Sequence, residues 1–231
     1  MLRFIRLLQW SLLACLAAGV LWFFWLFAWV LYWGHFNPGS TRFMEIRLAE
    51  LQEKNPQARL QFTWLPYAKI SIHLKRALIA AEDAKFVDHE GFDWQGIQLA
   101  IEKNQKKGRF VAGGSTISQQ LAKNLFLSPS RSLWRKGNEA VITLLLESLW
   151  SKQRIFEVYL NVIEWGNGVF GAEAAARHYF QSGAERLSPA QAARLAGMVP
   201  NPRYYDSHRN SSGLNRKTAI ILARMPTAQL P

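Results

Sequence analysis

The sequence has a single cysteine, Cys15, among its 231 residues, so no disulfide can form within the chain. Disulfide-stapled secreted scaffolds are therefore excluded, and a packed core must stabilise the fold. No cluster of cysteine and histidine has the spacing of zinc ligands, which leaves oxygen atoms as the ligands of any metal. Strand-like sequence is weak and confined to residues 58–64, and no internal repeat occurs. We expect an all-α or nearly all-α domain.

Acidic residues are also few, with 16 Asp and Glu against 28 Lys and Arg, which gives a net charge of +12. A stretch without any charge runs from Ser11 to Trp33. As a helix it would span about 34 Å, enough for a hydrocarbon layer of about 30 Å. Arg3 and Arg6 precede it, so the positive-inside rule puts the N-terminus in the cytoplasm and the rest outside. We expect a single uncleaved transmembrane anchor.

Two alternatives for this segment are a cleavable signal peptide and a lipoprotein signal around Leu12–Cys15. A signal peptide has an apolar region of about 7–15 residues followed by small residues. Here eight of the twelve residues from Trp22 to Trp33 are aromatic, which favours the anchor over both alternatives. The expected organisation is a cytoplasmic N-terminus (1–10), the anchor (11–33), a juxtamembrane segment (34–63) and a basic domain (64–231), which would be attracted to anionic lipid or to a pyrophosphate.

Nine further segments predict helices from their periodicity and from cap residues. They are residues 43–54, 71–81, 94–106, 115–124, 133–150, 151–161, 171–180, 189–198 and 215–225. Ser71 and either Ser115 or Thr116 are expected as N-caps, with Pro189 at a first helical position. Ile72, Ala77, Ile79 and Ala80 are expected to form a buried stripe. The glycine-rich residues 106–114 predict a mobile loop.

Three blocks mix carboxylate, imidazole, hydroxyl, amide and cationic groups in a way that neither a core nor a random surface explains. They are Glu82-Asp-Ala-Lys-Phe-Val-Asp-His-Glu-Gly91, Gly113-Gly-Ser-Thr-Ile-Ser-Gln-Gln-Leu-Ala-Lys-Asn124 and Arg135-Lys-Gly-Asn-Glu139. In the second block, Thr116, Gln120 and Asn124 share one helical face. A carboxylate block followed by a cationic and amide block suits a reaction that needs a base and a stabilised anionic leaving group.

With Tyr159-Leu-Asn161, Tyr179-Phe180 and Pro200-Asn-Pro202, these blocks resemble glycosyltransferase family 51, the peptidoglycan glycosyltransferases. The resemblance covers about Trp64 to Pro202 and implies a lysozyme-like, two-lobed all-α domain. It implies polymerisation of lipid II into β-1,4-linked glycan strands, by inversion, with release of undecaprenyl pyrophosphate. The chain has no Ser-x-x-Lys and no Lys-Thr-Gly or Lys-Ser-Gly, so nothing resembles a penicillin-binding transpeptidase site. The implied partners are lipid II, the nascent strand, the inner membrane and other cell-wall synthesis or division proteins, without nucleic acid.

The resemblance also implies roles for individual residues. Glu82 matches the general base and Glu139 the second essential carboxylate, and Asp83 is expected to raise the pKa of Glu82 by repulsion. The expected substrate-binding residues are Asp83, Phe86, His89, Ser115, Thr116, Gln119, Gln120, Lys123, Asn124, Arg135 and Lys136. A structural role is favoured for His89, and Glu147, Lys152, Tyr159 and Asn161 are expected to tie helices together. A hard cation, Mg²⁺ or Mn²⁺, is the one cofactor that the sequence allows, held by oxygens and the phosphates.

Two other functions stay open on the sequence alone. A lysozyme-like lytic enzyme would use a lone glutamate as general acid on finished peptidoglycan, but has no use for the cations Lys123, Arg135 and Lys136. A non-enzymatic basic protein tethered to the membrane is suggested only by charge. Incubation with labelled lipid II separates the three functions.

Overall fold

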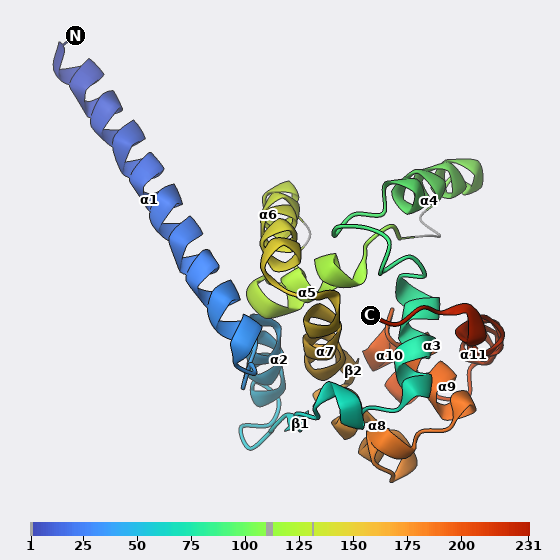
Figure 1. Ribbon diagram of the computed structural model, residues 1–231. Helices are drawn as coiled ribbons and strands as arrows, with labels where there is room; N and C mark the ends of the chain where they lie inside the picture. Colours follow the sequence, from blue (N-terminus) through green and yellow to red (C-terminus); the bar gives the residue numbers. More distant parts are fainter. Residues whose placement is uncertain (1, 110–112, 131) are drawn as a thin grey trace. The chain divides into compact units, whose positions relative to one another are not determined.

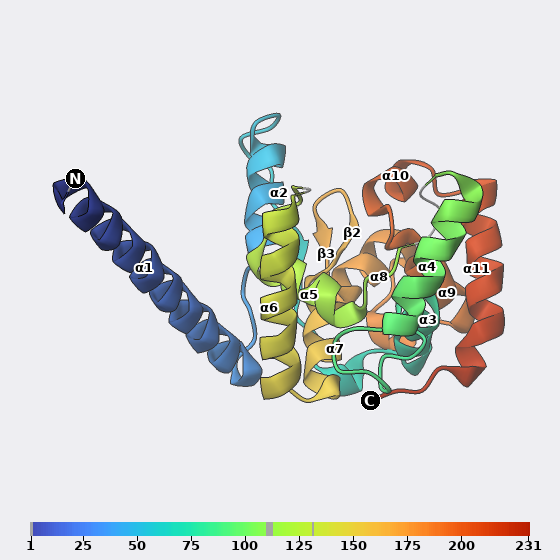
Figure 2. The same ribbon diagram turned by 90° about the horizontal axis from the view of Figure 1, so that it is seen from above.

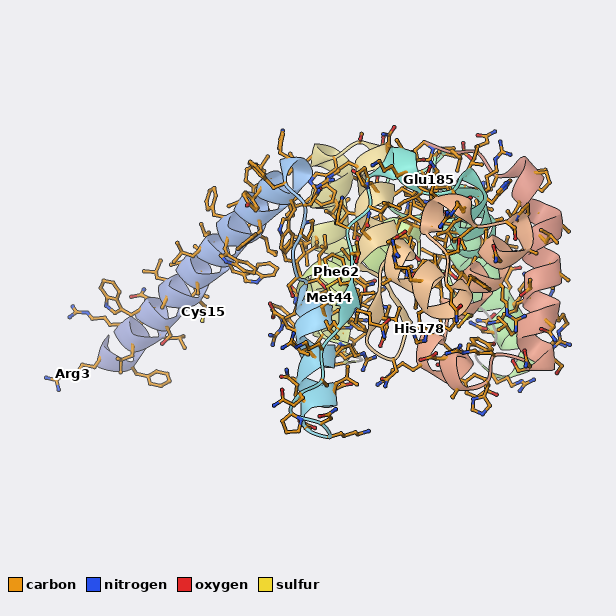
Figure 3. All side chains as sticks on the ribbon, turned by 90° about the horizontal axis from the view of Figure 1, so that it is seen from below. Arg3, Cys15, Met44, Phe62, His178 and Glu185 are labelled. Carbon is orange, nitrogen blue, oxygen red and sulfur yellow. The ribbon has the colours of Figure 1, made fainter. Side chains whose placement is uncertain are left out.

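The computed structural model describes residues 2–109, 113–130 and 132–231, which divide into two compact units. The first unit ends at Asn37 and consists of one continuous helix, α1 (Leu2–His35), drawn in blue in Figure 1. This helix is long and apolar enough to cross a membrane. Cys15 is exposed on it (Figure 3). The helix is longer than the charge-free stretch Ser11–Trp33 and continues beyond it at both ends.

The second unit, Pro38–Pro231, is mostly helical, which confirms the expected fold class. Its α-helices are α2 (Arg42–Gln52), α3 (Ile72–Glu82), α4 (Trp94–Lys107), α5 (Ile117–Phe126), α6 (Leu133–Leu149), α7 (Lys152–Val162), α8 (Ala172–Phe180), α9 (Pro189–Met198), α10 (Pro202–Ser207) and α11 (Ser212–Arg224). Short 3₁₀ turns are η1 (Tyr67–Lys69), η2 (Ala184–Arg186) and η3 (Met225–Thr227). All nine predicted helices are present, and the six-residue α10 was not predicted because it is too short to show a period.

The strands form one small sheet in the order β1-β3-β2. Strand β1 (Gln61–Phe62) falls within the predicted segment and pairs in parallel with β3 (Val169–Phe170), which pairs antiparallel with β2 (Glu164–Gly166). Strands β2 and β3 were not predicted. Both are buried at every position and therefore lack the alternation that marks a strand with one solvent face.

Helix starts follow the predicted cap chemistry. Ser71 accepts a hydrogen bond from the backbone N–H of His73 at 3.2 Å, and α9 begins with Pro189. Thr116, rather than Ser115, caps α5. The buried stripe of α3 was wrong at Ile72, which is 46% exposed because the buried face of the first turn is formed by Leu74 and Lys75. Helix α4 continues into the start of the predicted loop and ends at Lys107, and Gly108 follows as its C-cap in the left-handed region. Residues 110–112 of that loop lie outside the described residues.

The helices of this unit pack in two groups. Helix α3 packs against α9 and α11, and helix α5 packs against α2, α6 and α7 (Figures 1 and 2). Large side chains such as Phe156, Tyr159, Trp165 and Phe170 are fully buried, each burial contributing about 1.5–3 kcal/mol. Glu82 is the last residue of α3 and hydrogen-bonds to α5, so it lies where the two groups meet.

Candidate active site

Glu82 is a partly buried carboxylate held from the neighbouring helix. Its Oε2 accepts a hydrogen bond from Nε2 of Gln120 at 2.8 Å, and the hydroxyl of Tyr159 donates to Oε1 of the same glutamine at 3.0 Å. Burial raises the pKa of Glu82, opposed by the hydrogen bond from Gln120 and by the charges of Lys217 and Lys123. A carboxylate with a raised pKa is a stronger base when it is deprotonated.

Asp83 points into the protein and fixes the start of α5. Its side chain is buried, and its Oδ2 accepts the backbone N–H of Ile117 at 3.0 Å. Nε2 of His89 lies 3.0 Å from Oδ1 of Asp83, and the other ring nitrogen accepts from the backbone of Gly91 at 3.1 Å. Repulsion by Asp83 does raise the pKa of Glu82, as expected, but it is the smallest of the contributions, and burial is the largest. The structure thus places Asp83 and His89 in a supporting network.

At the start of α5, the residues expected to bind the donor differ in burial and in their hydrogen bonds. Thr116 and Gln119 are both buried and form a reciprocal capping box, in which each side chain accepts the backbone N–H of the other. Thr116 also donates to the carbonyl of Gly91 at 2.7 Å. Their polar groups are therefore engaged within the protein. Ser115 is exposed and lines a pocket beside Glu82.

One pocket carries most of the positive charge and is called the cationic pocket here. It has a volume of about 400 Å³ and is lined by Arg47, Lys123, Arg135 and Arg203 together with the carboxylate of Glu164. Burial lowers the pKa of Lys123, while Glu139 opposes this shift. The buried Nε of Arg135 has no hydrogen-bond partner within the described residues. Such a lining suits an anionic ligand that completes the unpaired donors.

Amides connect this pocket to the base. Gln120, the partner of Glu82, lines the cationic pocket, as does Asn124 one turn later. Asn124 donates through Nδ2 to the backbone carbonyl of Gln120 at 2.8 Å. The expectation of one shared face is confirmed for Gln120 and Asn124, which line the same pocket, whereas Thr116, the third residue, caps α5 and lines the pocket that contains Glu82.

Glu139 is a buried carboxylate, 3% exposed, that holds two cations of the third block. Nη1 of Arg135 donates to its Oε2 at 2.6 Å, and Nζ of Lys136 contacts its Oε1. The pair with Arg135 orients a guanidinium that lines the cationic pocket. Lys136 is about half exposed and is not among the residues that line this pocket.

A second pocket lies on the other side of Glu82, with a volume of about 430 Å³, and is called the second pocket here. Its lining includes Glu82, Ser115, Lys103 and Arg224. Glu82 also lines a smaller hollow of about 180 Å³ with Lys217 and Arg224. The base is thus accessible from a side that the four cations of the cationic pocket do not line.

Other predicted residues lie in the core or tie helices together. Phe86 is fully buried against Phe156, with ring centroids 5.6 Å apart, and does not line either pocket. Nζ of Lys152 donates to Glu147 at 2.9 Å, and Glu147 also accepts from Ser118. Asn161 exchanges two hydrogen bonds with the backbone of Leu65, at 2.8 and 3.0 Å. The expected tying of helices is confirmed for Glu147, Lys152 and Tyr159, whereas Asn161 ties α7 to the irregular segment that contains Leu65.

Sequence reasoning missed Arg47, Glu164, Lys217 and Arg224 as lining residues. Arg47 lies on the helix α2, whose sequence carries no polar motif, and Glu164 lies in a strand of three residues. The last two lie on α11, far along the chain from the three blocks. Only the Pro200-Asn-Pro202 turn carried a signal, and it does line the cationic pocket.

Comparison with known proteins shows the family of the chain. Residues 48–226 match the family model described as transglycosylase. The chain is 72% identical to the biosynthetic peptidoglycan transglycosylase of Dechloromonas aromatica over 226 residues, 98% of each chain. It is 62% identical to that of Chromobacterium violaceum, over 98% of this chain and 99% of the relative, and 64% identical to that of Methylobacillus flagellatus, over 98% and 100%. The chain belongs to the transglycosylase family.

Proposed function

We propose that this protein is a peptidoglycan glycosyltransferase that polymerises lipid II into β-1,4-linked glycan strands. The observation that carries the proposal is the position of Glu82. Its carboxylate lines the second pocket and is hydrogen-bonded to Gln120, a residue of the cationic pocket. A base that lines one pocket and is linked through Gln120 to a second, strongly cationic pocket suits transfer between two substrates, one of which leaves as an anion.

In the proposed mechanism, the cationic pocket holds the growing strand by its undecaprenyl pyrophosphate. Lys123 and Arg135 compensate the phosphate charge, and Glu139 keeps Arg135 in place. The second pocket receives the acceptor lipid II. Glu82 takes the proton from the 4-hydroxyl of its N-acetylglucosamine, whose oxygen then attacks the anomeric carbon of the donor's N-acetylmuramic acid. The bond from that carbon to the phosphate oxygen breaks, the configuration inverts and undecaprenyl pyrophosphate leaves.

We keep a divalent cation as part of the proposal, with its ligands drawn largely from the substrate. Within the described ranges, no group of three or more histidine, cysteine, aspartate or glutamate side chains is placed to hold a metal ion. Both oxygens of Glu139 already accept from Arg135 and Lys136. A Mg²⁺ or Mn²⁺ ion would therefore rely on phosphate oxygens, which both ions favour.

The proposed location is the bacterial inner membrane, with α1 as a single-pass anchor. The basic residues Arg3 and Arg6 support a cytoplasmic N-terminus and a periplasmic catalytic unit. Lipid II and the nascent strand are the proposed substrates, and other cell-wall synthesis or division proteins the proposed partners. The lipid tails of both substrates confine them to the same membrane, which raises their effective concentration near a tethered enzyme.

The test uses purified full-length protein in detergent with fluorescent lipid II. Formation of a glycan polymer that lysozyme digests supports the proposal, and a parallel reaction with chelator reports the need for a metal. Release of fragments from added sacculi, without polymer, would instead support the lytic enzyme. If neither polymer nor fragments form, the result would support the non-enzymatic basic binding protein.

A further inference from the structure

Helix α2 forms part of the wall of the cationic pocket, although its first six residues precede the segment matched by the family model. That segment begins at residue 48, whereas Phe43 and Arg47 line the pocket. Helix α2 packs directly on α5, which carries Lys123, and the ring of Phe43 lies close to two cations. Cζ of Arg47 is 4.8 Å and Nζ of Lys123 is 5.9 Å from its centroid. The expected juxtamembrane segment therefore contributes to the site.

The guanidinium of Arg47 is held on three sides. Nε donates to Oε2 of Glu164 at 3.2 Å, Nη1 donates to Glu50 at 2.6 Å, and the ring of Phe43 lies against the guanidinium. The side chain is only 12% exposed. A guanidinium fixed in this way loses little further freedom on binding a ligand, and its planar fork suits oxyanions.

Nη2 of Arg47 is the remaining donor group, and it makes no hydrogen bond within the described residues. Unlike Nε of Arg135, it is not fully buried. It is therefore open to a ligand. The two carboxylates do not cancel the charge of the pocket. Glu50 is 42% exposed, is shared with Arg203 and does not line the pocket. Glu164 is the one carboxylate among the residues that line the pocket, against the four cations Arg47, Lys123, Arg135 and Arg203. Burial raises its pKa, and the charge of Arg47 opposes this shift.

We propose that Arg47 is a further substrate-binding residue that donates from Nη2 to an anionic oxygen of the donor, and that Glu164 is its positioning residue. This inference rests on the proposed function, since the donor strand occupies the cationic pocket there. The shared chemistry is an oxyanion, which the substrate offers both in its pyrophosphate and in the carboxylates of its stem peptide. A charge-assisted hydrogen bond of this kind corresponds to about a 10- to 100-fold effect on affinity.

The experiment compares Arg47→Gln with Arg42→Gln in the full-length protein. Arg42 lies on the same helix, pairs only with Glu45 at the surface and does not line the pocket, so the control removes the same charge. We expect Arg47→Gln to raise KM for lipid II about 10- to 100-fold with a smaller change in kcat, and Arg42→Gln to change KM less than about twofold.

Inhibition by inorganic pyrophosphate distinguishes the two oxyanions. A weakened inhibition in Arg47→Gln, parallel to KM, supports a contact with the pyrophosphate; a raised KM with unchanged inhibition supports a contact with a carboxylate. Glu164→Gln keeps an oxygen for Nε but removes the charge, so we expect a smaller rise in KM. Arg47→Lys keeps the charge but cannot be held by two carboxylates, and carries the test if Arg47→Gln fails to fold.

An Arg47→Gln or Arg47→Lys protein with a lowered melting temperature, but with wild-type KM and wild-type pyrophosphate inhibition, would overturn the proposal, because Arg47 would then only tie α2 to β2. Failure of the proposed function looks different. In that case the wild-type protein itself forms no polymer from lipid II.

Discussion

Replacing Glu82 by glutamine tests the centre of the proposed mechanism. The amide keeps the size of the side chain, and its oxygen still accepts from Nε2 of Gln120, 2.8 Å from the present carboxylate oxygen. It cannot take a proton from the acceptor hydroxyl. Loss of a general base costs about 10²–10⁴-fold in rate, so we expect the polymerisation rate to fall by that factor. Binding of lipid II should change little.

Glu82→Asp gives a second measure of the same site. It keeps the charge but withdraws the carboxylate by one methylene, about 1.5 Å. The contact with Gln120 would break, and a displacement of this size costs up to about 10²-fold. Both variants are assayed in detergent with fluorescent lipid II at saturating concentration. Retention of more than about a tenth of the wild-type rate by Glu82→Gln would rule this residue out as the base.

The pH dependence adds an independent check. Because the pKa of Glu82 is raised, the proposed base gains a proton on acidification at a higher pH than an ordinary glutamate, and the rate should fall there. The sign for stability is opposite. Between the ordinary pKa and the raised folded-state pKa, the folded protein binds more protons than the unfolded protein, so the free energy of unfolding decreases as pH rises. Glu82→Gln should remove that decrease, which denaturant melts at several pH values would detect.

Three further predictions concern the phosphate contacts, the anchor and the support of α5. Lys123→Ala and Arg135→Ala should each lower the rate strongly and weaken binding of moenomycin, a phosphoglycolipid that this family binds at its donor site; unchanged moenomycin affinity would contradict the phosphate role. Removal of Met1–Trp33 should leave a folded protein with reduced activity on liposomes and partial recovery in micelles, whereas equal activity on liposomes at all lipid II densities would limit the anchor to export. Asp83→Asn should cost about 2 kcal/mol of unfolding free energy and lower the melting temperature by about 4–8 °C. The control Asp88→Asn, at an exposed position, should leave the melting temperature unchanged. Equal melting temperatures for the two variants would show that the network around Asp83 adds no stability.

Local signals carried most of the fold. Helices such as α3, α5 and α9 follow residues whose side chains cap them, and such a cap joins neighbours two or three positions apart. The small sheet shows the limit of such signals. Gln61 and Val169 pair across more than a hundred residues, and no property of either segment alone indicates the other.

The candidate site divides in the same way. The three polar blocks identified Glu82, Lys123 and Arg135 because each block is continuous in sequence. Arg47 and Glu164 meet only through the packing of α2 on α5 and the position of β2, so no local pattern could join them. The pKa of Glu82 was expected to rise through Asp83, but burial is the main cause, and burial depends on the whole fold.

The neighbouring carboxylates Glu82 and Asp83 have separate tasks because α3 ends between them. Glu82 is the last helical residue, while Asp83 has left the helix with φ −160° and ψ 76°, so consecutive side chains point in different directions. One carboxylate faces the pockets, and the other holds the first N–H of α5. Helix α5 in turn brings Gln120 to Glu82 and Lys123 into the cationic pocket. The distance between Glu82 and Lys123 is therefore set by a single helix, whose start is fixed by the residue next to the base. Because Asp83 makes only the smallest contribution to the pKa of Glu82, a change at Asp83 should alter the rate mainly through geometry.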